Sequence, residues 1–363
     1  MDSVTILIAT LNSERTLRLV LNSIKAQTYP KNLIETLIVD GGSTDSTLEI
    51  AKEYRCRVIS NPRVGPAHAK YLGYLNTTSK YLVFLDHDEV YESDRSIERK
   101  VALLKDNPYV KIVIGSGYKN PQGCSFINEY LNEFGDPFSF FMYRLSKSSQ
   151  HFIKSMCNRY SVLKESDTRL IFDFSHYIKL PIIEPGAAGS MIDKEYYETK
   201  YKKFVKNENE AYHFQAMYFY YLMDSECCYL GIVKEDAIFH YSAESLSGYL
   251  RKIKWRIKNN IHHITEAGIA GFTSREKFEF NPVRKYLKFL FIPYSIMALP
   301  ALIDALYLVG SRKKMLYFIH VQLCMYTASL IIYNYSLRLI GRKPPLMSYD
   351  EKVAVPSQIS KDL

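Results

Sequence analysis

The stretch Lys80–Glu89, KYLVFLDHDE, decides how the rest of the chain is interpreted. Its apolar run Tyr81–Leu85 has the length and the aromatic and branched side chains of a buried strand, and it ends abruptly at Asp86-His87-Asp88. Open α/β sheets bind ligands at the carboxyl ends of their strands. Alternation along an extended backbone places Asp86 and Asp88 on one side, so we expect them to share a divalent cation with a diphosphate. A strand-end turn with solvated acids is the alternative.

The composition predicts a folded, basic protein. Of 363 residues, 47% are hydrophobic, enough for one large or two modest domains with a core. The 47 Lys and Arg exceed the 38 Asp and Glu, for a formal net charge of +9, and basic residues become more frequent after Arg251. Nucleic acid, an anionic membrane or phosphorylated substrates would suit this charge. The six cysteines lack ligand-like spacing, so we expect reduced core thiols. The N-terminus lacks a basic signal-peptide region, so we expect the catalytic part to face the cytosol.

Strands and helices alternate in the first third of the chain. The predicted strands are Val4–Ala9, Leu33–Val39, Arg57–Ser60 and Tyr81–Leu85, and helices are predicted from Glu14, at Ser46–Tyr54 and at Ala67–Leu75. Ser13 is the expected cap of the first helix, and Asp45 or Ser43 that of the second. The alternation implies right-handed crossovers, a mostly parallel sheet and an α/β fold.

Three motifs stand in a fixed order: ATLNSE at 9–14, VDGGSTD at 39–45 and FLDHDE at 84–89. Together they resemble the nucleotide-binding half of family 2 glycosyltransferases, which have the GT-A fold, a Rossmann-like sheet flanked by helices. The resemblance implies that Asp40 hydrogen-bonds the base of a nucleotide. It further implies a nucleotide-sugar site lined by Thr10, Asn12 and Glu14, with ribose, diphosphate and Mg²⁺ or Mn²⁺ held by Asp86 and Asp88.

Several of these residues have a second interpretation. Lys70 stands where the family often has Arg, so its contact with the diphosphate is a loose match. Asp40 is alternatively a turn acid, and Glu14 alternatively complements the dipole of its helix.

Further site residues are expected downstream. The loop 184–191, EPGAAGSM, matches the family's border to the donor sugar. NENEA at 207–211 stands where the family often has a Glu-Asp pair, so Glu208 or Glu210 is the expected general base, unless both are first-turn helix acids. His240 ends a predicted strand and is either a metal or diphosphate ligand or a surface residue.

The later segments favour a membrane. The aromatic stretch Phe126–Leu145 is either core or an interfacial segment, and Gly248–His262 predicts a basic amphipathic helix with Trp255 at an anionic surface. No motif supports the rival, nucleic acid. Phe289–Val309 and Met315–Tyr333 predict two membrane-embedded helices, spanning, re-entrant or interfacial, although Asp304 near the bilayer centre would cost about 2.5 to 3.5 kcal/mol. The alternative is a buried hairpin of a soluble domain.

The expected organisation is a GT-A domain over 1–245, a basic connecting segment over 246–285, an apolar hairpin over 286–340 and a polar tail over 341–363. The expected activity is inverting, metal-dependent transfer from a nucleotide diphosphate sugar to a lipid-linked glycan or polyprenyl phosphate, at the cytosolic face of the cell membrane. A non-catalytic membrane scaffold is the alternative. A sugar nucleotidyltransferase is disfavoured, because ATLNSE lacks the Gly-rich basic loop that such an enzyme needs.

Overall fold

A nine-stranded sheet forms the centre of the molecule. The computed structural model describes residues 2–62, 65–175, 189–204, 228–263, 287–310 and 313–347. The strand order across the sheet is β3-β2-β1-β4-β10-β6-β11-β9-β8. These strands are β1 Val4–Thr10, β2 Ile34–Asp40, β3 Arg57–Ser60, β4 Tyr81–Asp86, β6 Ile112–Ile114, β8 Ser161–Glu165, β9 Arg169–Asp173, β10 Ser190–Asp193 and β11 Tyr229–Val233.

The sheet is mostly parallel, as predicted. Strands β1 to β4 are parallel to one another, with Val4 opposite both Ile34 and Tyr81. Strands β9 and β10 run against their partners, so the far half of the sheet is mixed. Strands β1, β2 and β4 therefore end at one edge, where the loops after Thr10, Asp40 and Asp86 lie together.

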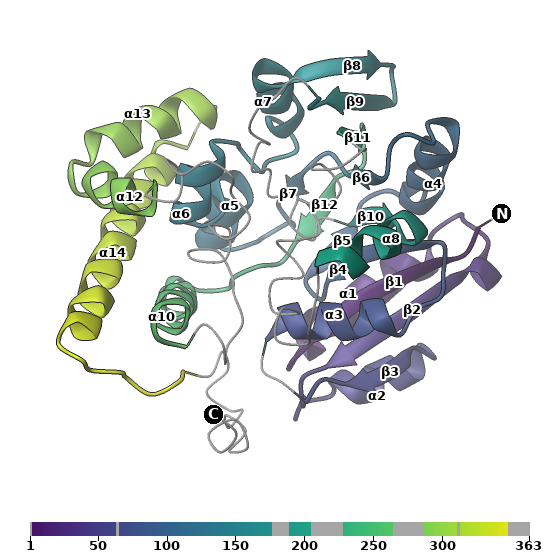
Figure 1. Cartoon of the computed structure of the whole chain (residues 1–363), viewed down its shortest axis with the longest axis horizontal. Coiled ribbons are helices and arrows are strands. Elements are labelled where there is room, and N and C mark those ends of the chain that lie inside the picture. Colours follow the sequence, from purple (N-terminus) through teal and green to yellow (C-terminus); the bar gives the residue numbers. More distant parts are fainter. Residues whose placement is uncertain are drawn as a thin grey trace.

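Helices cover both faces of the sheet because its buried side chains alternate. Ile6, Ile8 and Val83 face one core, which α1, α2 and α4 close, whereas Leu7 and Phe84 face the core beneath α3, α7 and α8. The helices are α1 Glu14–Lys25, α2 Thr47–Glu53, α3 Pro66–Leu75, α4 Ser96–Asp106, α7 Phe152–Arg159 and α8 Lys194–Phe204. Figure 1 shows these layers around the sheet, and they confirm the predicted α/β fold.

A second, three-stranded sheet carries His240 to the edge of the first. It consists of β5 Glu89–Tyr91, β12 Ile238–His240 and β7 Tyr118–Lys119, with β12 in the middle. Strand β5 follows β4 after the two-residue turn His87-Asp88 and pairs with β12, so that His240 stands opposite Glu89. This register places His240 beside Asp88.

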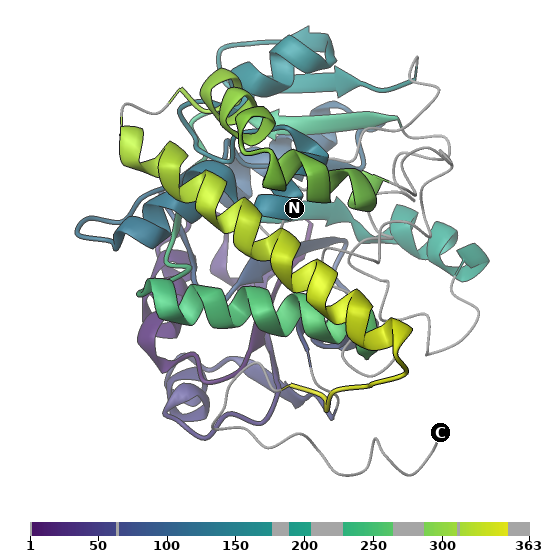
Figure 2. The ribbon, with the colours of Figure 1, turned by 90° about the vertical axis from the view of Figure 1, so that its left-hand side faces the viewer.

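A helical cluster adjoins the α/β layers and has its own core. Its members are α5 Phe126–Phe134, α6 Pro137–Tyr143, α10 Leu246–His262, α12 Leu287–Ile296, α13 Leu299–Leu308 and α14 Lys314–Leu339. In Figure 1, α5 and α6 lie between α12–α14 and the sheet, and in Figure 2 α14 crosses over α10. Much of the aromatic stretch Phe126–Leu145 is therefore core, with Tyr130 and Phe134 fully buried, although Phe126 is 39% exposed.

Three expectations about these helices are corrected. The first apolar run is not one helix, because α12 and α13 meet at 94° around Met297-Ala298. Trp255 is 6% exposed and belongs to the buried side of α10, which packs on α14, so it is not an interfacial anchor. Asp304 forms an ion pair with Arg144 at 2.7 Å, which offsets the cost of its charge.

Candidate active site

The loops that follow β1 and β2 are hydrogen-bonded to each other. These bonds involve residues that we expect to line the base and ribose of a nucleotide. The backbone N–H of Asn12 donates to Ser43 Oγ at 2.9 Å, and Asn12 Oδ1 accepts from the Thr44 N–H at 2.9 Å. The Glu14 carboxylate accepts from the Ser46 N–H at 3.1 Å. The structure thus brings Asn12 and Glu14 to the expected edge, where their side chains tie the first loop to the second.

Asp40 is almost fully buried and organises its own turn. Its Oδ1 accepts from the hydroxyls of Thr10 (2.8 Å) and Ser43 (2.6 Å), and its Oδ2 accepts from the N–H groups of Gly42 (2.9 Å) and Ser43 (2.8 Å). A carboxylate has about four acceptor positions, so these bonds occupy it. A base would reach Asp40 only by replacing one of them, and that contact stays a prediction.

The expected helix caps are partly wrong. Ser13 occupies the cap position of α1, but its hydroxyl accepts from the Leu11 N–H at 3.2 Å and caps nothing. The cap position of α2 is Ser46, but Asp45, one residue earlier, accepts from the Thr47 N–H at 3.0 Å and so satisfies a donor of the first turn.

Asp86 and Asp88 do not share one side of an extended backbone. The strand ends at Asp86, and the turn at His87-Asp88 gives the two acids different partners. Asp86 Oδ1 pairs with the Lys70 ammonium at 2.7 Å, and Lys70 is buried whereas the Asp86 side chain is 40% exposed. Burial by itself would raise the pKa of Asp86. The charge and the hydrogen bond of the Lys70 ammonium outweigh burial and hold this pKa below its ordinary value. Lys70 therefore lies beside Asp86, and its contact with a diphosphate stays a prediction.

Asp88, in the turn before β5, faces His240 at the end of the neighbouring strand β12. Asp88 Oδ2 lies 3.7 Å from His240 Nε2, and the Tyr241 N–H donates to the Asp88 carbonyl at 2.9 Å. Burial lowers the pKa of His240 to about 4, although the Asp88 charge acts in the opposite direction. His240 is thus neutral at pH 7, with its ring stacked on Tyr118 at 4.4 Å between centroids.

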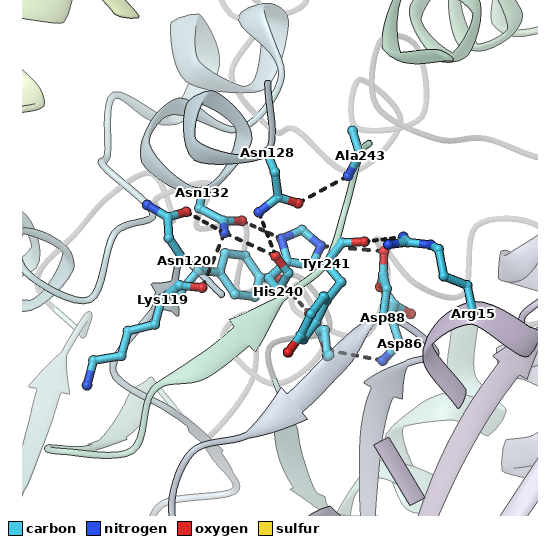
Figure 3. Close-up of polar contacts among 12 residues, drawn as sticks. Arg15, Asp86, Asp88, Lys119, Asn120, Asn128, Asn132, His240, Tyr241 and Ala243 are labelled. Carbon is cyan, nitrogen blue, oxygen red and sulfur yellow. Dashed lines mark hydrogen bonds and ion pairs between the residues drawn. The ribbon is translucent and has the colours of Figure 1, made fainter. Parts of the chain in front are cut away.

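Polar side chains from both sides fix the segment 240–244 over this site. Asn128 and Asn132, on α5, bond the backbone of His240 and Ala243. From α1, Arg15 donates to the Tyr241 carbonyl at 2.6 Å. Figure 3 shows the amides reaching the segment from one side and Arg15 from the other.

Glu89 lies directly behind the acid pair and is fully buried. Its Oε1 accepts from the Tyr118 hydroxyl at 2.6 Å, and its Oε2 accepts from the Asp86 N–H at 3.1 Å. Burial, reinforced by the charges of Asp86 and Asp88, raises the pKa of Glu89 to about 8. Glu89 is therefore a mostly neutral carboxylic acid at pH 7 and adds little negative charge to the site.

The arrangement fits a divalent cation that brings oxygen ligands of its own. Among the described residues, no group of three or more His, Cys, Asp or Glu side chains could hold a metal. Asp88 and His240 offer one oxygen and one nitrogen, a ligand pair that suits Mn²⁺ better than Mg²⁺, which prefers oxygen. In the same turn, His87 Nδ1 is buried without a hydrogen-bond partner. Two protein ligands and a diphosphate would complete such a site.

Some expectations lie outside the described residues, and some site residues were not foreseen. Glu208, Glu210 and most of the loop 184–191 belong to the undescribed ranges. Asn128 and Asn132 were missed because the aromatic residues of their stretch dominated its interpretation. Their signal was two amides at helical i,i+4 spacing, on one face of a short helix.

Glu89 should make the stability of the metal-free protein fall as the pH rises. The unfolded chain releases the Glu89 proton near pH 4.5, whereas the folded protein keeps it up to about pH 8. Between these values the folded state binds more protons, so the stabilising effect of this group declines with pH and levels off above about 8. In EDTA, the Tm of the wild type minus that of Glu89→Gln should therefore decrease between about pH 5 and 8.

Glu53→Gln is the matched control. Its hydrogen bond with Arg18 holds the pKa of exposed Glu53 below the ordinary value, so the acid is ionised in both states above pH 5. The Tm difference for this variant should stay constant. A Glu89→Gln difference that is equally constant would contradict a raised pKa.

Comparisons with known proteins point to one family. Residues 5–165 match the family described as Glycosyl transferase family 2. The glycosyltransferase GlyA of Streptococcus pneumoniae is 38% identical over 98 residues, which are 26% of this chain and 14% of that protein. The glycosyltransferase AglE of Haloferax volcanii is 33% identical over 91 residues, which are 23% of this chain and 30% of that protein. The chain thus matches less than a third of the length of either relative.

Solved structures resemble the chain more distantly. The mannosyltransferase PcManGT of Pyrobaculum calidifontis, solved with GDP-Man and Mn²⁺, has a TM-score of 0.48 at 13% identity, over 93% of this chain and 87% of that one. TarS 1–349 of S. aureus, solved with UDP, has a TM-score of 0.45 at 12% identity, over 94% and 92%. The family match includes Thr10, Asp40, Asp86 and Asp88, whereas His240 lies outside it. Over residues 5–165 the chain therefore resembles glycosyl transferase family 2.

Proposed function

We propose that this protein transfers a glycosyl group, with inversion, from a nucleoside diphosphate sugar to a lipid-linked glycan or a polyprenyl phosphate at the cytosolic face of the cell membrane. The family match supports glycosyl transfer. The observation that carries the donor is the pairing of Asp88 Oδ2 with His240 Nε2 at 3.7 Å, beside Lys70 and Asp86. Two acceptor atoms that face each other without a hydrogen bond can both coordinate a cation. A diphosphate binds divalent cations and would supply the remaining oxygen ligands.

Each described residue has a proposed task at the donor. Lys70 fixes Asp86 in place, and Asp86 in turn presents its exposed oxygen to the ribose and diphosphate. Asp88 and His240 would hold the cation, which neutralises the charge that develops on the diphosphate as it leaves. Thr10, Asn12, Glu14 and Asp40 would border the base and ribose.

The acceptor oxygen would attack the anomeric carbon in line with the leaving diphosphate, which inverts the configuration at that carbon. If the acceptor is a sugar hydroxyl, Glu208 or Glu210 is the proposed general base. A lipid phosphate is already ionised at neutral pH and needs no base.

An apolar surface on the C-terminal helices supports a lipid partner. Among the described residues, α14 alone is long and apolar enough to cross a membrane, and the bent pair α12–α13 would count as a second crossing if it formed one broken span. Many large apolar side chains on these helices are more than 40% exposed. They include Phe289, Leu290, Ile296, Met297, Leu299, Ile303, Leu306, Tyr307, Met315, Phe318, Ile332 and Tyr333. We call this set the apolar surface. Exposed apolar side chains gathered on neighbouring helices are typical of an interaction site.

The packing of α14 favours a helix that lies in the plane of the membrane. Its buried side chains, from Leu316 to Asn334, form one face that packs on α5, α6, α10, α12 and α13. If α14 spanned the bilayer, the domain attached along this face would have to enter the lipid as well. An in-plane position needs only the opposite face, which includes Phe318 and Ile332, to be apolar and exposed.

Basic residues at both ends of α14 fit anionic headgroups. Lys313 and Lys314 precede the exposed apolar face, and Arg338, Arg342 and Lys343 follow it, all of them exposed. Lys and Arg near an anionic surface each contribute about 1 kcal/mol to binding, in addition to the burial of apolar side chains.

The donor site is tested by nucleotide binding. Full-length protein should bind UDP or GDP more tightly with Mn²⁺ than with EDTA, and Asp88→Asn should remove that metal-dependent gain, about tenfold or more, because the carboxylate ligand is lost. Isothermal titration measures both affinities. Asp193→Asn is the matched control, because Asp193 pairs with Lys111 at the opposite edge of the sheet.

An Asp88→Asn variant that keeps the full Mn²⁺-dependent gain would contradict the cation site.

Turnover separates an enzyme from a scaffold. Release of nucleoside diphosphate from a panel of nucleotide sugars, with and without lipid acceptor, should be metal-dependent. Metal-dependent binding without any turnover would favour the scaffold.

The membrane surface is tested by flotation of full-length protein with lipid vesicles. The wild type should float with vesicles that contain phosphatidylglycerol and less with neutral phosphatidylcholine. The double variant Phe318→Glu/Ile332→Glu should bind at least about tenfold more weakly, because two charged side chains would replace apolar side chains that insert into the lipid.

Val162→Glu/Leu163→Glu is the matched control, since both side chains are exposed apolar residues of β8, outside the apolar surface. It should float like the wild type. Equal flotation of the two double variants would contradict the membrane surface, and wild-type protein that stays unbound but dimeric would assign that surface to a second copy.

A further inference from the structure

Two amide side chains on α5 converge on the strand that ends at His240. Asn128 and Asn132 are one turn apart on the same face of the helix, and each is at most 2% exposed. The Asn128 amide bonds the backbone at the end of this strand: its Nδ2 donates to the His240 carbonyl at 2.9 Å, and its Oδ1 accepts from the Ala243 N–H at 3.2 Å. Asn132 also reaches the imidazole ring, as Figure 3 shows.

The surroundings of Asn132 determine which way its amide points. Its Nδ2 lies 3.2 Å from the Lys119 carbonyl, 3.1 Å from the His240 carbonyl and 2.9 Å from Asn120 Oδ1. Carbonyl oxygens only accept hydrogen bonds, so the reversed amide would set oxygen against oxygen at these positions. Asn132 Oδ1 is thereby directed at His240 Nδ1, 2.7 Å away.

This orientation sets the tautomer of His240. Because Asn132 Oδ1 can only accept, His240 Nδ1 must carry the proton. A neutral imidazole has one such proton, so Nε2 keeps its lone pair. Nε2 and Asp88 Oδ2 therefore face each other as two acceptors, 3.7 Å apart, and the stack on Tyr118 holds the ring in this plane.

We propose that Asn132 is a positioning residue that holds His240 in the Nδ1–H tautomer, so that the Nε2 lone pair and the Asp88 carboxylate stay open toward a divalent cation. The identity of the cation's partner, a nucleoside diphosphate, rests on the proposed function, whereas the tautomer does not. Without Asn132, the favoured tautomer would carry its proton on Nε2 and donate it to Asp88. His240 and Asp88 would then be hydrogen-bonded to each other, and a cation would have to displace the Nε2 proton.

The tautomer is measured directly in metal-free, full-length protein labelled with ¹⁵N-histidine. Long-range ¹H–¹⁵N correlation spectra at neutral pH distinguish a protonated from an unprotonated ring nitrogen, and the signals lost in His240→Gln identify His240. The wild type should show a protonated Nδ1 and an unprotonated Nε2. In Asn132→Leu the proton should move to Nε2.

Two further variants separate this role from general damage. Asn128→Leu removes an equally buried amide from the same helix face and should leave the tautomer unchanged. Asn132→Asp keeps an acceptor for Nδ1–H and should preserve the wild-type tautomer, even though its donors to Lys119 and His240 are lost.

Affinity for Mn²⁺ in the presence of UDP or GDP supplies the second measurement. Outer partners of metal-bound histidines typically contribute 10- to 100-fold to affinity, so Asn132→Leu should weaken Mn²⁺ binding by about that factor. Wild-type protein with a protonated Nε2, or Asn132→Leu with an unchanged tautomer, would overturn the proposal. If the tautomer results hold but no variant binds nucleotide, the donor assignment fails instead and the positioning role stands.

Discussion

The pairing of β5 with β12 is the constraint on which the site depends. It sets His240 opposite Glu89 and so brings residues from distant parts of the chain to one place. Asp88, in the turn before β5, then lies across from His240 Nε2. A shift of one residue in this register would turn His240 to the other face of its strand, away from Tyr118 and Asp88. The buried Glu89, which accepts bonds from Tyr118 and Asp86, helps to fix the register.

Helix α5 connects this site to the apolar surface. One of its faces carries Asn128 and Asn132, which hold the backbone after β12. Another face packs on α14, where the Tyr130 hydroxyl bonds His320 Nδ1 at 2.9 Å and Phe134 stacks on the His320 ring at 4.7 Å. A single helix of nine residues thus fixes the distance between the proposed membrane surface and the proposed cation site. An acceptor whose lipid lies in the membrane would therefore reach the donor at a fixed distance from the proposed membrane surface.

Much of this fold could be predicted from the sequence, because hydrophobic periodicity is strong in the first third of the chain. Strand Arg57–Ser60 has the predicted bounds, β1 and β4 each extend one residue further at the carboxyl end, and β2 is shifted by one residue at both ends. The acids at the end of β4 and the strand that ends at His240 were also foreseen. These features follow from local patterns that tertiary contacts do not override.

Other features depend on contacts that no local pattern encodes. The alternation rule failed for Asp86 and Asp88, since a two-residue turn interrupts the extended backbone between them. Ser13 has the chemistry of a helix cap, but its hydroxyl is occupied within the loop. The bend between α12 and α13 was missed, because composition does not reveal that Ala298 adopts a positive φ of 60°.

The central claim is that a divalent cation binds between Asp88 and His240 together with a nucleoside diphosphate. Pulsed electron paramagnetic resonance of Mn²⁺ in the complex with UDP or GDP tests it most directly, because a coordinated histidine nitrogen modulates the electron spin echo. We predict modulation from one imidazole nitrogen that changes on ¹⁵N-histidine labelling and disappears in His240→Gln. Nucleotide-dependent Mn²⁺ binding without any histidine modulation in the wild type would contradict the assignment.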